Sequence, residues 1–132
     1  MKSILILDDE TVLRNAFAAY FEDCLWQTYQ AESAEKALKM LEEITPDAAT
    51  VDIRLPHMDG DEFIREACVL KPKMVFVICT GSPEYFVPTD LQEYAQVSNQ
   101  IFKKPMTKLN NLKNEIDRLI KEIEKTKVEN DS

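Results

Sequence analysis

Long apolar runs are absent from this sequence of 132 residues. The longest, such as residues 74–79, have six residues, whereas a membrane-spanning helix needs about 20, so we expect no membrane span. The first apolar stretch, residues 4–7, is too short for a secretory signal, and no cleavage site follows it. We therefore expect a cytoplasmic protein.

Cysteine and histidine are also scarce. The three cysteines, Cys24, Cys68 and Cys79, are odd in number, and their spacing is not that of zinc ligands. We predict buried, reduced thiols and no zinc site. The single histidine, His57, lies in a polar loop, where we expect it to be exposed and without a chemical role.

Basic charge is in the minority. Sixteen Lys and Arg stand against 24 Asp and Glu, for a net charge of -8. Residues 1–105 hold 10 basic and 18 acidic side chains, whereas residues 106–132 hold six of each. Binding to a phosphate backbone requires a clustered basic face, so we expect no direct nucleic-acid partner.

The hydrophobic pattern that remains predicts alternating strands and helices. Ser33 and Asp59 are predicted helix N-caps. The strand at 26–31 is the least apolar and is expected at an edge, and the strand at 74–79 is the most apolar and is expected to be central. Strands are expected at residues 3–7, 26–31, 48–53, 74–79 and 100–103, and helices at 11–25, 33–44, 59–69, 84–97 and 107–127.

Five such strand–helix pairs predict an α/β fold, a doubly wound five-stranded parallel sheet with helices on both faces. In these sheets the functional crevice lies beyond the carboxyl ends of the strands. The side chains that follow the predicted strands should therefore meet at one edge: Asp8 and Asp9, Asp52, Thr80 and Gly81, and Lys104.

The chemistry of this set is informative. Crowded carboxylates repel one another unless a cation is present, and all-oxygen ligands favour Mg²⁺. A lysine and a hydroxyl offer a bound phosphoryl group a counter-charge and a hydrogen bond, and a glycine leaves its N–H open to an anion. A carboxylate can itself be the nucleophile. Together these residues indicate phosphoryl transfer.

The sequence resembles the receiver domains of two-component response regulators over about residues 2–125. That family implies a flavodoxin-like strand order of 2-1-3-4-5. Four motifs in the right order and spacing carry the resemblance: Ile4-Leu5-Ile6-Leu7-Asp8-Asp9-Glu10, Val51-Asp52-Ile53-Arg54-Leu55-Pro56-His57-Met58-Asp59-Gly60, Thr80-Gly81 and Lys103-Lys104-Pro105.

The resemblance implies that Asp52 is the phosphoacceptor, taking its phosphoryl group from the phosphohistidine of a sensor histidine kinase or from a phosphotransfer protein. Thr80 and Gly81 would then bind the phosphoryl oxygens, and Lys104 would pair with them. The Lys104–Pro105 peptide bond is typically cis in this family.

The same resemblance implies a Mg²⁺ site. Asp9 would ligate the ion directly, and Asp8 directly or through water. Asp52 and the backbone carbonyl of Arg54 would complete the protein ligands.

Two positions depart from the family pattern. Ile101 stands where many receivers have an aromatic residue that moves inward on phosphorylation, so the usual coupling to Thr80 is in question. Arg54 and Ser82 occupy the two positions that commonly tune hydrolysis, and neither offers an acid or an amide to orient water. We therefore expect slow loss of the phosphoryl group.

The last predicted helix carries a two-heptad apolar seam. Its residues suit either packing on the sheet of the same chain or a weak homodimer. We expect a receiver domain over residues 1–127 and a frayed polar tail over 128–132. The seam consists of Leu109, Leu112, Ile116, Leu119 and Ile123.

The sequence is compatible with several hypotheses about the function of the chain. The chain could be a regulator that acts alone by presenting its fourth helix and fifth strand to an unknown protein, or a receiver fragment of a larger transcriptional regulator. A receiver-like interaction module that works without phosphorylation is the alternative. An enzyme of the same sheet type is less favoured, because no glycine-rich loop follows the first strand. We expect the chain to catalyse only its own phosphorylation and dephosphorylation.

Overall fold

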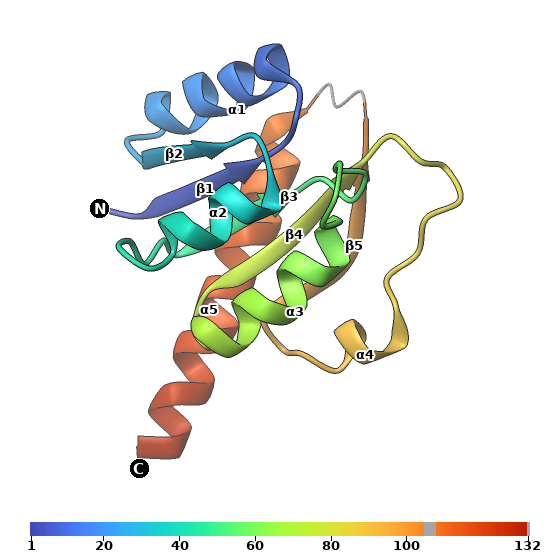
Figure 1. Ribbon diagram of the computed structural model, residues 1–132. Helices are drawn as coiled ribbons and strands as arrows, with labels where there is room; N and C mark the ends of the chain where they lie inside the picture. The colour runs from blue at the N-terminus through green and yellow to red at the C-terminus, as the bar shows by residue number, and fades with distance from the viewer. Residues whose placement is uncertain (105–107, 132) are drawn as a thin grey trace.

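The computed structural model describes residues 1–104 and 108–131, with side chains up to residue 125. Its centre is a parallel sheet of five strands in the order β2-β1-β3-β4-β5 (Figure 1). β1 (Ser3–Leu7) lies between β2 (Gln27–Ala31) and β3 (Ala48–Val51). β4 (Val75–Thr80) lies between β3 and β5 (Val97–Lys103). The predicted fold class and strand order are therefore confirmed.

Helices cover both faces of the sheet (Figure 1). α1 (Thr11–Asp23) and α5 (Leu109–Asp131) lie on one face, and α2 (Ala34–Met40), α3 (Gly60–Leu70) and the short α4 (Thr89–Gln92) lie on the other. No helix in the described part of the chain has the length and apolar character needed to cross a bilayer.

The two faces of β1 show how the core is divided. Ile4 and Ile6 pack with α1 and α5, whereas Leu5 and Leu7 pack with α2 and α3. This alternation follows from the two-residue period of a strand. Since both sets are apolar, the sheet is buried on both faces and its chemistry is confined to the strand ends.

The predicted helix starts are confirmed by their caps. The Ser33 side chain accepts a hydrogen bond from the N–H of Lys36 at 3.1 Å, and that of Asp59 accepts one from Glu62 at 2.9 Å. The edge position expected for the second strand is confirmed as well. β4 is fully buried and interior, but the middle strand of the sheet is β3.

The segment between β4 and β5 differs from its prediction. The helix expected over 84–97 is wrong, because α4 covers only Thr89–Gln92 and Val97 already pairs with Phe76 of β4. The strand expected over 100–103 begins three residues earlier, at Val97. A register shift between Phe76 and Ile78 interrupts this pairing, so the early part of β5 lacks a clean two-residue alternation.

The last helix is longer than expected and its seam is used within the chain. α5 runs to Asp131, and its predicted start at residue 107 lies outside the described residues, as does Pro105. Three seam residues are buried and two are partly buried in the core beside α1, so the packing alternative accounts for the seam. A homodimer through this helix and the division of the chain at residue 127 stay predictions.

Candidate functional site

The strand ends bring the predicted side chains to one edge of the sheet. Leu7 of β1 pairs with residues of both β2 and β3, and Thr80 of β4 pairs with Lys103 of β5. Two backbone hydrogen bonds continue this register past the strands. The N–H of Asp52 donates to the carbonyl of Leu7 at 3.0 Å, and that of Lys104 donates to the carbonyl of Thr80 at 2.9 Å.

The Lys104 ammonium lies between two buried carboxylates. Its Nζ is 2.5 Å from Oδ2 of Asp8 and 3.3 Å from Oδ2 of Asp52. Asp8 is only 4% exposed and Asp52 only 5%. One cation thus serves two anions, and the shorter contact belongs to Asp8.

This unequal sharing leaves the Asp52 carboxylate poorly compensated. Burial is the largest effect and raises its pKa, Lys104 lowers it, the charge of Asp8 raises it and the N–H of Arg54 lowers it, and the net pKa is about 6. Burial also lowers the pKa of Lys104, but the bond to Asp8 and the charge of Asp52 outweigh that effect, and the net shift is upward. The ammonium is therefore firmly charged, and Asp52 is the group whose charge is costly.

An acidic group lies beside this pair. One carboxylate oxygen from each of Asp8, Asp9 and Glu10 lies within 4.8 Å of the others, and Asp9 and Glu10 are exposed. Both oxygens of Asp8 already accept hydrogen bonds, from the N–H of Glu10 at 2.8 Å and from Lys104. An all-oxygen, anionic donor set of this kind fits a hard divalent cation such as Mg²⁺.

Glu10 is the acidic residue that the sequence reasoning did not use as a ligand. The signal was present, because three acidic residues follow β1 without interruption. Asp9 and Glu10 also line an open depression of about 440 Å³ together with Asp52, Arg54 and Lys104. Asp52 lies in this depression but outside the tight acidic group.

The side chains of Arg54 and Ser82 bond to each other. A guanidinium nitrogen of Arg54 donates to the hydroxyl of Ser82 at 3.2 Å, and the N–H of Arg54 donates to Oδ1 of Asp52 at 3.2 Å. Arg54 is exposed at the side chain and lines the depression. The sequence indicated both positions but not the bond between them.

Thr80 and Gly81 are placed differently although they are neighbours. The Thr80 side chain is completely buried, and its Oγ1 accepts a hydrogen bond from the N–H of Ser82 at 3.1 Å. Gly81 is exposed and lines the depression, and a Cβ built on it would meet nothing within 4 Å. Contact between the Thr80 hydroxyl and a ligand in the depression therefore requires the residues after β4 to move.

Ile101 and the cysteines belong to the packing and not to the depression. Ile101 is half-buried against the core on the α2 and α3 face, where it pairs with Ile78. All three cysteines are free. Cys68 and Cys79 are buried as predicted, whereas Cys24 is only partly buried.

Comparison with known proteins is decisive for the family. The model of the response regulator receiver domain matches residues 4–117 of this chain. The chain belongs to that family. It is therefore a receiver domain of two-component signalling, a class of domain that interacts with histidine kinases or phosphotransfer proteins and binds Mg²⁺ at an acidic pocket.

Several relatives support this assignment. The chain is 28% identical over 104 residues to sporulation initiation phosphotransferase F of Bacillus subtilis, covering 79% of this chain and 82% of the relative. It is 30% identical over 111 residues to protein-glutamate methylesterase/protein-glutamine glutaminase 1 of Pseudomonas savastanoi pv. phaseolicola, covering 83% of this chain. This chain matches only 31% of that methylesterase and 23% of a second one, from Burkholderia thailandensis.

Solved structures agree with the fold. A CheY-like receiver domain protein from Methanospirillum hungatei superposes with a TM-score of 0.81 at 27% identity, over 96% of this chain and 98% of that one. The response regulator TrrA from Thermotoga maritima, solved in complex with Mg²⁺ and BeF, gives a TM-score of 0.76 at 25% identity, over 90% and 99% of the chains.

Proposed function

We propose that Asp52 is the phosphoacceptor of this receiver domain. A carboxylate oxygen of Asp52 attacks the phosphorus of a phosphohistidine on a sensor histidine kinase or phosphotransfer protein. A P–O bond forms as the P–N bond breaks, and the imidazole leaves with the donor protein. The observation that carries the proposal is the buried Asp52 carboxylate, which opens into the depression with a lysine ammonium 3.3 Å away.

The other residues act on the charge of the transferred group. Lys104 shifts from its contact with Asp52 to the phosphoryl oxygens, while its bond to Asp8 keeps the ammonium in position. Gly81 presents its backbone N–H, and the Thr80 hydroxyl approaches after a rearrangement of the residues that follow β4. A nucleophile with a pKa of about 6 is mostly ionised at pH 7 and above, as this chemistry requires.

A Mg²⁺ ion would be held at the acidic edge by Asp8, Asp9, Asp52 and the backbone carbonyl of Arg54. The ion supplies positive charge that offsets the repulsion between the carboxylates and the incoming phosphoryl group. Glu10 lies close enough to be a further ligand, directly or through water.

The test is the intact mass of the protein after incubation with acetyl phosphate and Mg²⁺. We expect the gain of a single phosphoryl group, lost in Asp52→Ala and in a sample with chelator. Asp23→Asn, which removes an exposed carboxylate at the end of α1, should gain the group normally. A protein that gains no phosphoryl group and binds neither Mg²⁺ nor beryllofluoride would be an interaction module that works without phosphorylation.

We also expect slow loss of the phosphoryl group. The side chains of Arg54 and Ser82 bond to each other, and neither acts as a base toward water. Decay within seconds at neutral pH, followed by the same mass measurement, would contradict this expectation.

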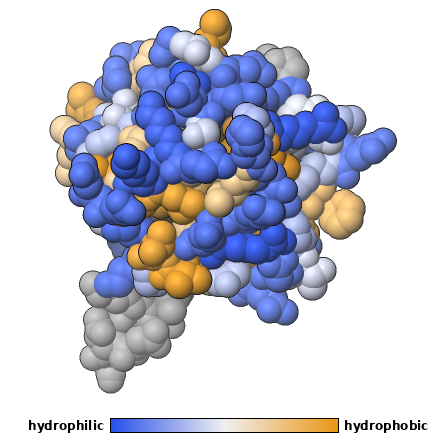
Figure 2. Space-filling model, in the orientation of Figure 1, coloured by the Kyte–Doolittle hydropathy of each residue, from blue (hydrophilic) through white to orange (hydrophobic). Residues whose placement is uncertain are grey.

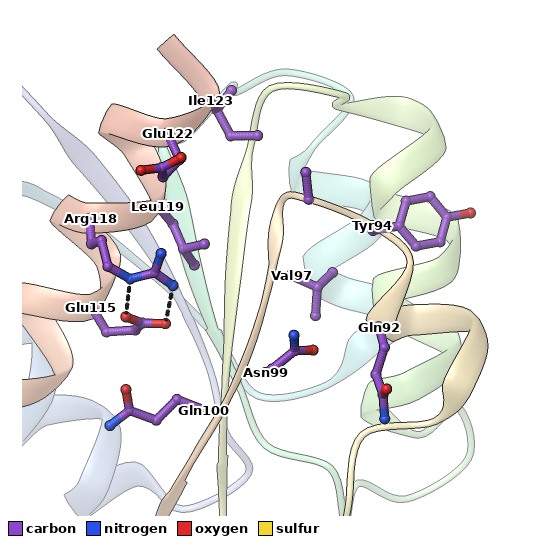
Figure 3. Close-up of a pocket in the computed structure, with 11 residues that line it drawn as sticks. Gln92, Tyr94, Val97, Asn99, Gln100, Glu115, Arg118, Leu119, Glu122 and Ile123 are labelled. Atoms are coloured by element: carbon purple, nitrogen blue, oxygen red, sulfur yellow. Dashed lines mark hydrogen bonds and ion pairs between the residues drawn. The ribbon is translucent and has the colours of Figure 1, made fainter. Parts of the chain in front are cut away.

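The surface formed by α4, β5 and α5 is the proposed contact for a downstream protein. A pocket of about 410 Å³ opens there, with Tyr94, Val97 and Ile123 among its lining (Figure 3). On one wall, the Glu115 carboxylate accepts hydrogen bonds from Arg118 at 2.7 and 2.9 Å (Figure 3). It accepts a further hydrogen bond from the hydroxyl of Ser98.

We propose that the chain acts as a receiver domain in the cytoplasm. The chain matches only 23% and 31% of the length of the methylesterases, so no methylesterase activity is proposed. The similarity to the sporulation initiation phosphotransferase supports transfer of phosphoryl groups between proteins as the role proposed for this chain.

A further inference from the structure

An apolar groove lies on the opposite side of the sheet from α5, between α2 and α3. It has a volume of about 860 Å³, about twice that of the depression at Asp52. Two side chains at the end of α3, Val69 and Leu70, are 74% and 55% exposed, and Leu38 and Met58 continue the apolar lining. Figure 2 shows hydrophobic residues gathered on the face where α2 and α3 lie, with hydrophilic residues around them. A contiguous apolar surface with a polar rim is typical of an interaction site.

The rim of the groove is predominantly acidic. It carries three carboxylates and two basic groups, Glu35, Glu42 and Glu66 with Lys39 and Arg65. Arg65 already forms a two-point ion pair with Asp90 of α4, with contacts of 2.7 and 3.2 Å. The charge that remains at the rim is therefore negative, as it is over the chain as a whole.

The shape and charge together select one kind of occupant. Two neighbouring helices with an apolar groove between them accept a third helix whose apolar residues recur every three or four positions. A negative rim favours lysine and arginine beside that apolar stripe. A second copy of this chain fits poorly, because its net charge is -8 and the largest apolar side chains of α1, together with the apolar seam of α5, pack in the core.

We propose that the α2–α3 groove binds an amphipathic helix of a partner protein that carries basic residues beside its apolar stripe. This surface is separate from the α4–β5–α5 surface and from the depression at Asp52. It touches the loop after Asp52 at one point. Met58 lines the groove, and its N–H donates to the carboxylate of Glu35 at 3.0 Å.

The test uses a fluorescein-labelled synthetic peptide of 18 leucines and lysines, with the leucines at helical spacing. Its fluorescence anisotropy is titrated with the unphosphorylated protein at about 0.15 M salt, so the result does not depend on phosphorylation. We expect saturable binding that the double variant Val69→Ser/Leu70→Gln weakens about tenfold or more. Both side chains are exposed, so we expect this variant to fold, and circular dichroism checks that it does.

A matched control removes an exposed apolar side chain elsewhere. Val12→Ser on α1, where valine is 84% exposed, should change the dissociation constant less than twofold. The proposal is overturned if Val12→Ser weakens binding as much as the double variant, or if no binding is measurable at about 0.1 mM protein. Self-association of the protein through the groove, seen as a doubled mass that Val69→Ser/Leu70→Gln abolishes, would also overturn it.

The charge of the rim is tested separately. Glu42→Lys/Glu66→Lys should weaken binding of the leucine–lysine peptide about tenfold, and a peptide with glutamate in place of lysine should bind more weakly still. Glu84→Lys/Glu93→Lys makes the same change in net charge at exposed positions outside the groove. It should change the logarithm of the dissociation constant of the peptide by less than half as much as Glu42→Lys/Glu66→Lys does. Equal effects of the two double variants would mean that only overall charge attracts the peptide, and the proposed rim would be wrong.

Discussion

The substitution Asp52→Asn should stabilise the protein when no divalent cation is present. The Asp52 carboxylate is 5% exposed, and its cationic contact among the described residues, Lys104, is shared with Asp8, which lies closer to the ammonium. Asparagine keeps the shape of the side chain and can still accept the hydrogen bond from the N–H of Arg54. What it removes is a buried negative charge.

The size of the effect follows from the pKa. The pKa of Asp52 is raised from 3.8 to about 6. Each pKa unit corresponds to 1.36 kcal/mol, so the charged form costs roughly 3 kcal/mol at most above pH 6. Relaxation of the site reduces this value, and we expect a gain of about 1–3 kcal/mol in the free energy of unfolding. That corresponds to roughly 4 °C in Tm per kcal/mol for a domain of this size.

The stability gained by Asp52→Asn should depend on pH. Because the folded pKa lies above the unfolded one, the native state binds the proton more tightly, and protonation of Asp52 stabilises the fold. The cost of the charge is complete above about pH 6 and is lost as the pH falls toward 3.8. The difference in stability between the variant and the wild type should therefore be largest near pH 8 and should close by about pH 4.

The assay is urea unfolding followed by circular dichroism between pH 4 and 8, in buffer with chelator. Asp23→Asn, at an exposed carboxylate, serves as the control and should match the wild type within about 0.5 kcal/mol. Addition of Mg²⁺ should narrow the difference, because an ion at the proposed site compensates the carboxylate. A variant that is no more stable than the wild type at pH 8, or a difference independent of pH, would refute the reasoning.

Two further predictions concern glycine and cysteine. Gly60→Ala should lower the free energy of unfolding by about 1–3 kcal/mol in the same urea assay, because a Cβ there would lie 2.4 Å from a backbone carbonyl oxygen of the loop after β3. Gly81→Ala, where a Cβ would meet nothing within 4 Å, should change it by less than about 0.5 kcal/mol. Burial raises the pKa of both Cys68 and Cys79 to about 12, so iodoacetamide at pH 8 should modify only Cys24 in the native protein. Peptide mass mapping checks this, and alkylation of either buried thiol would contradict the prediction.

The strand ends were predictable because a parallel sheet aligns them. Short apolar runs followed by Asp8, Asp52 and Lys104 are local signals, and the topology rule for such sheets is enough to bring them to one edge. The helix caps at Ser33 and Asp59 were predictable for a similar reason, since each depends on a side chain and an N–H three residues apart.

The start of β5 was not predictable from its own residues. Ser98, Asn99 and Gln100 are polar and lie where the register between β4 and β5 shifts, so neither a strand nor a helix period is visible. The buried Gln96 side chain fixes this region through hydrogen bonds to the carbonyls of Lys71 and Met74 at 3.1 and 2.7 Å. These partners lie more than 20 residues away in the chain, beyond any local pattern.

The sequence likewise did not predict how the charged side chains pair within the site. Motif and spacing place Lys104 beside Asp52, but they do not indicate that Asp8 holds the shorter contact. That preference follows from the pairing of β1 with its neighbours, which buries Asp8 and leaves its two oxygens facing Glu10 and Lys104. Because the ammonium is held by Asp8, it stays in the site when the charge of Asp52 changes. In the proposed transfer, the same lysine would therefore face Asp52 before phosphorylation and the phosphoryl group after it, whereas the Thr80 hydroxyl would reach that group only after the residues that follow β4 move.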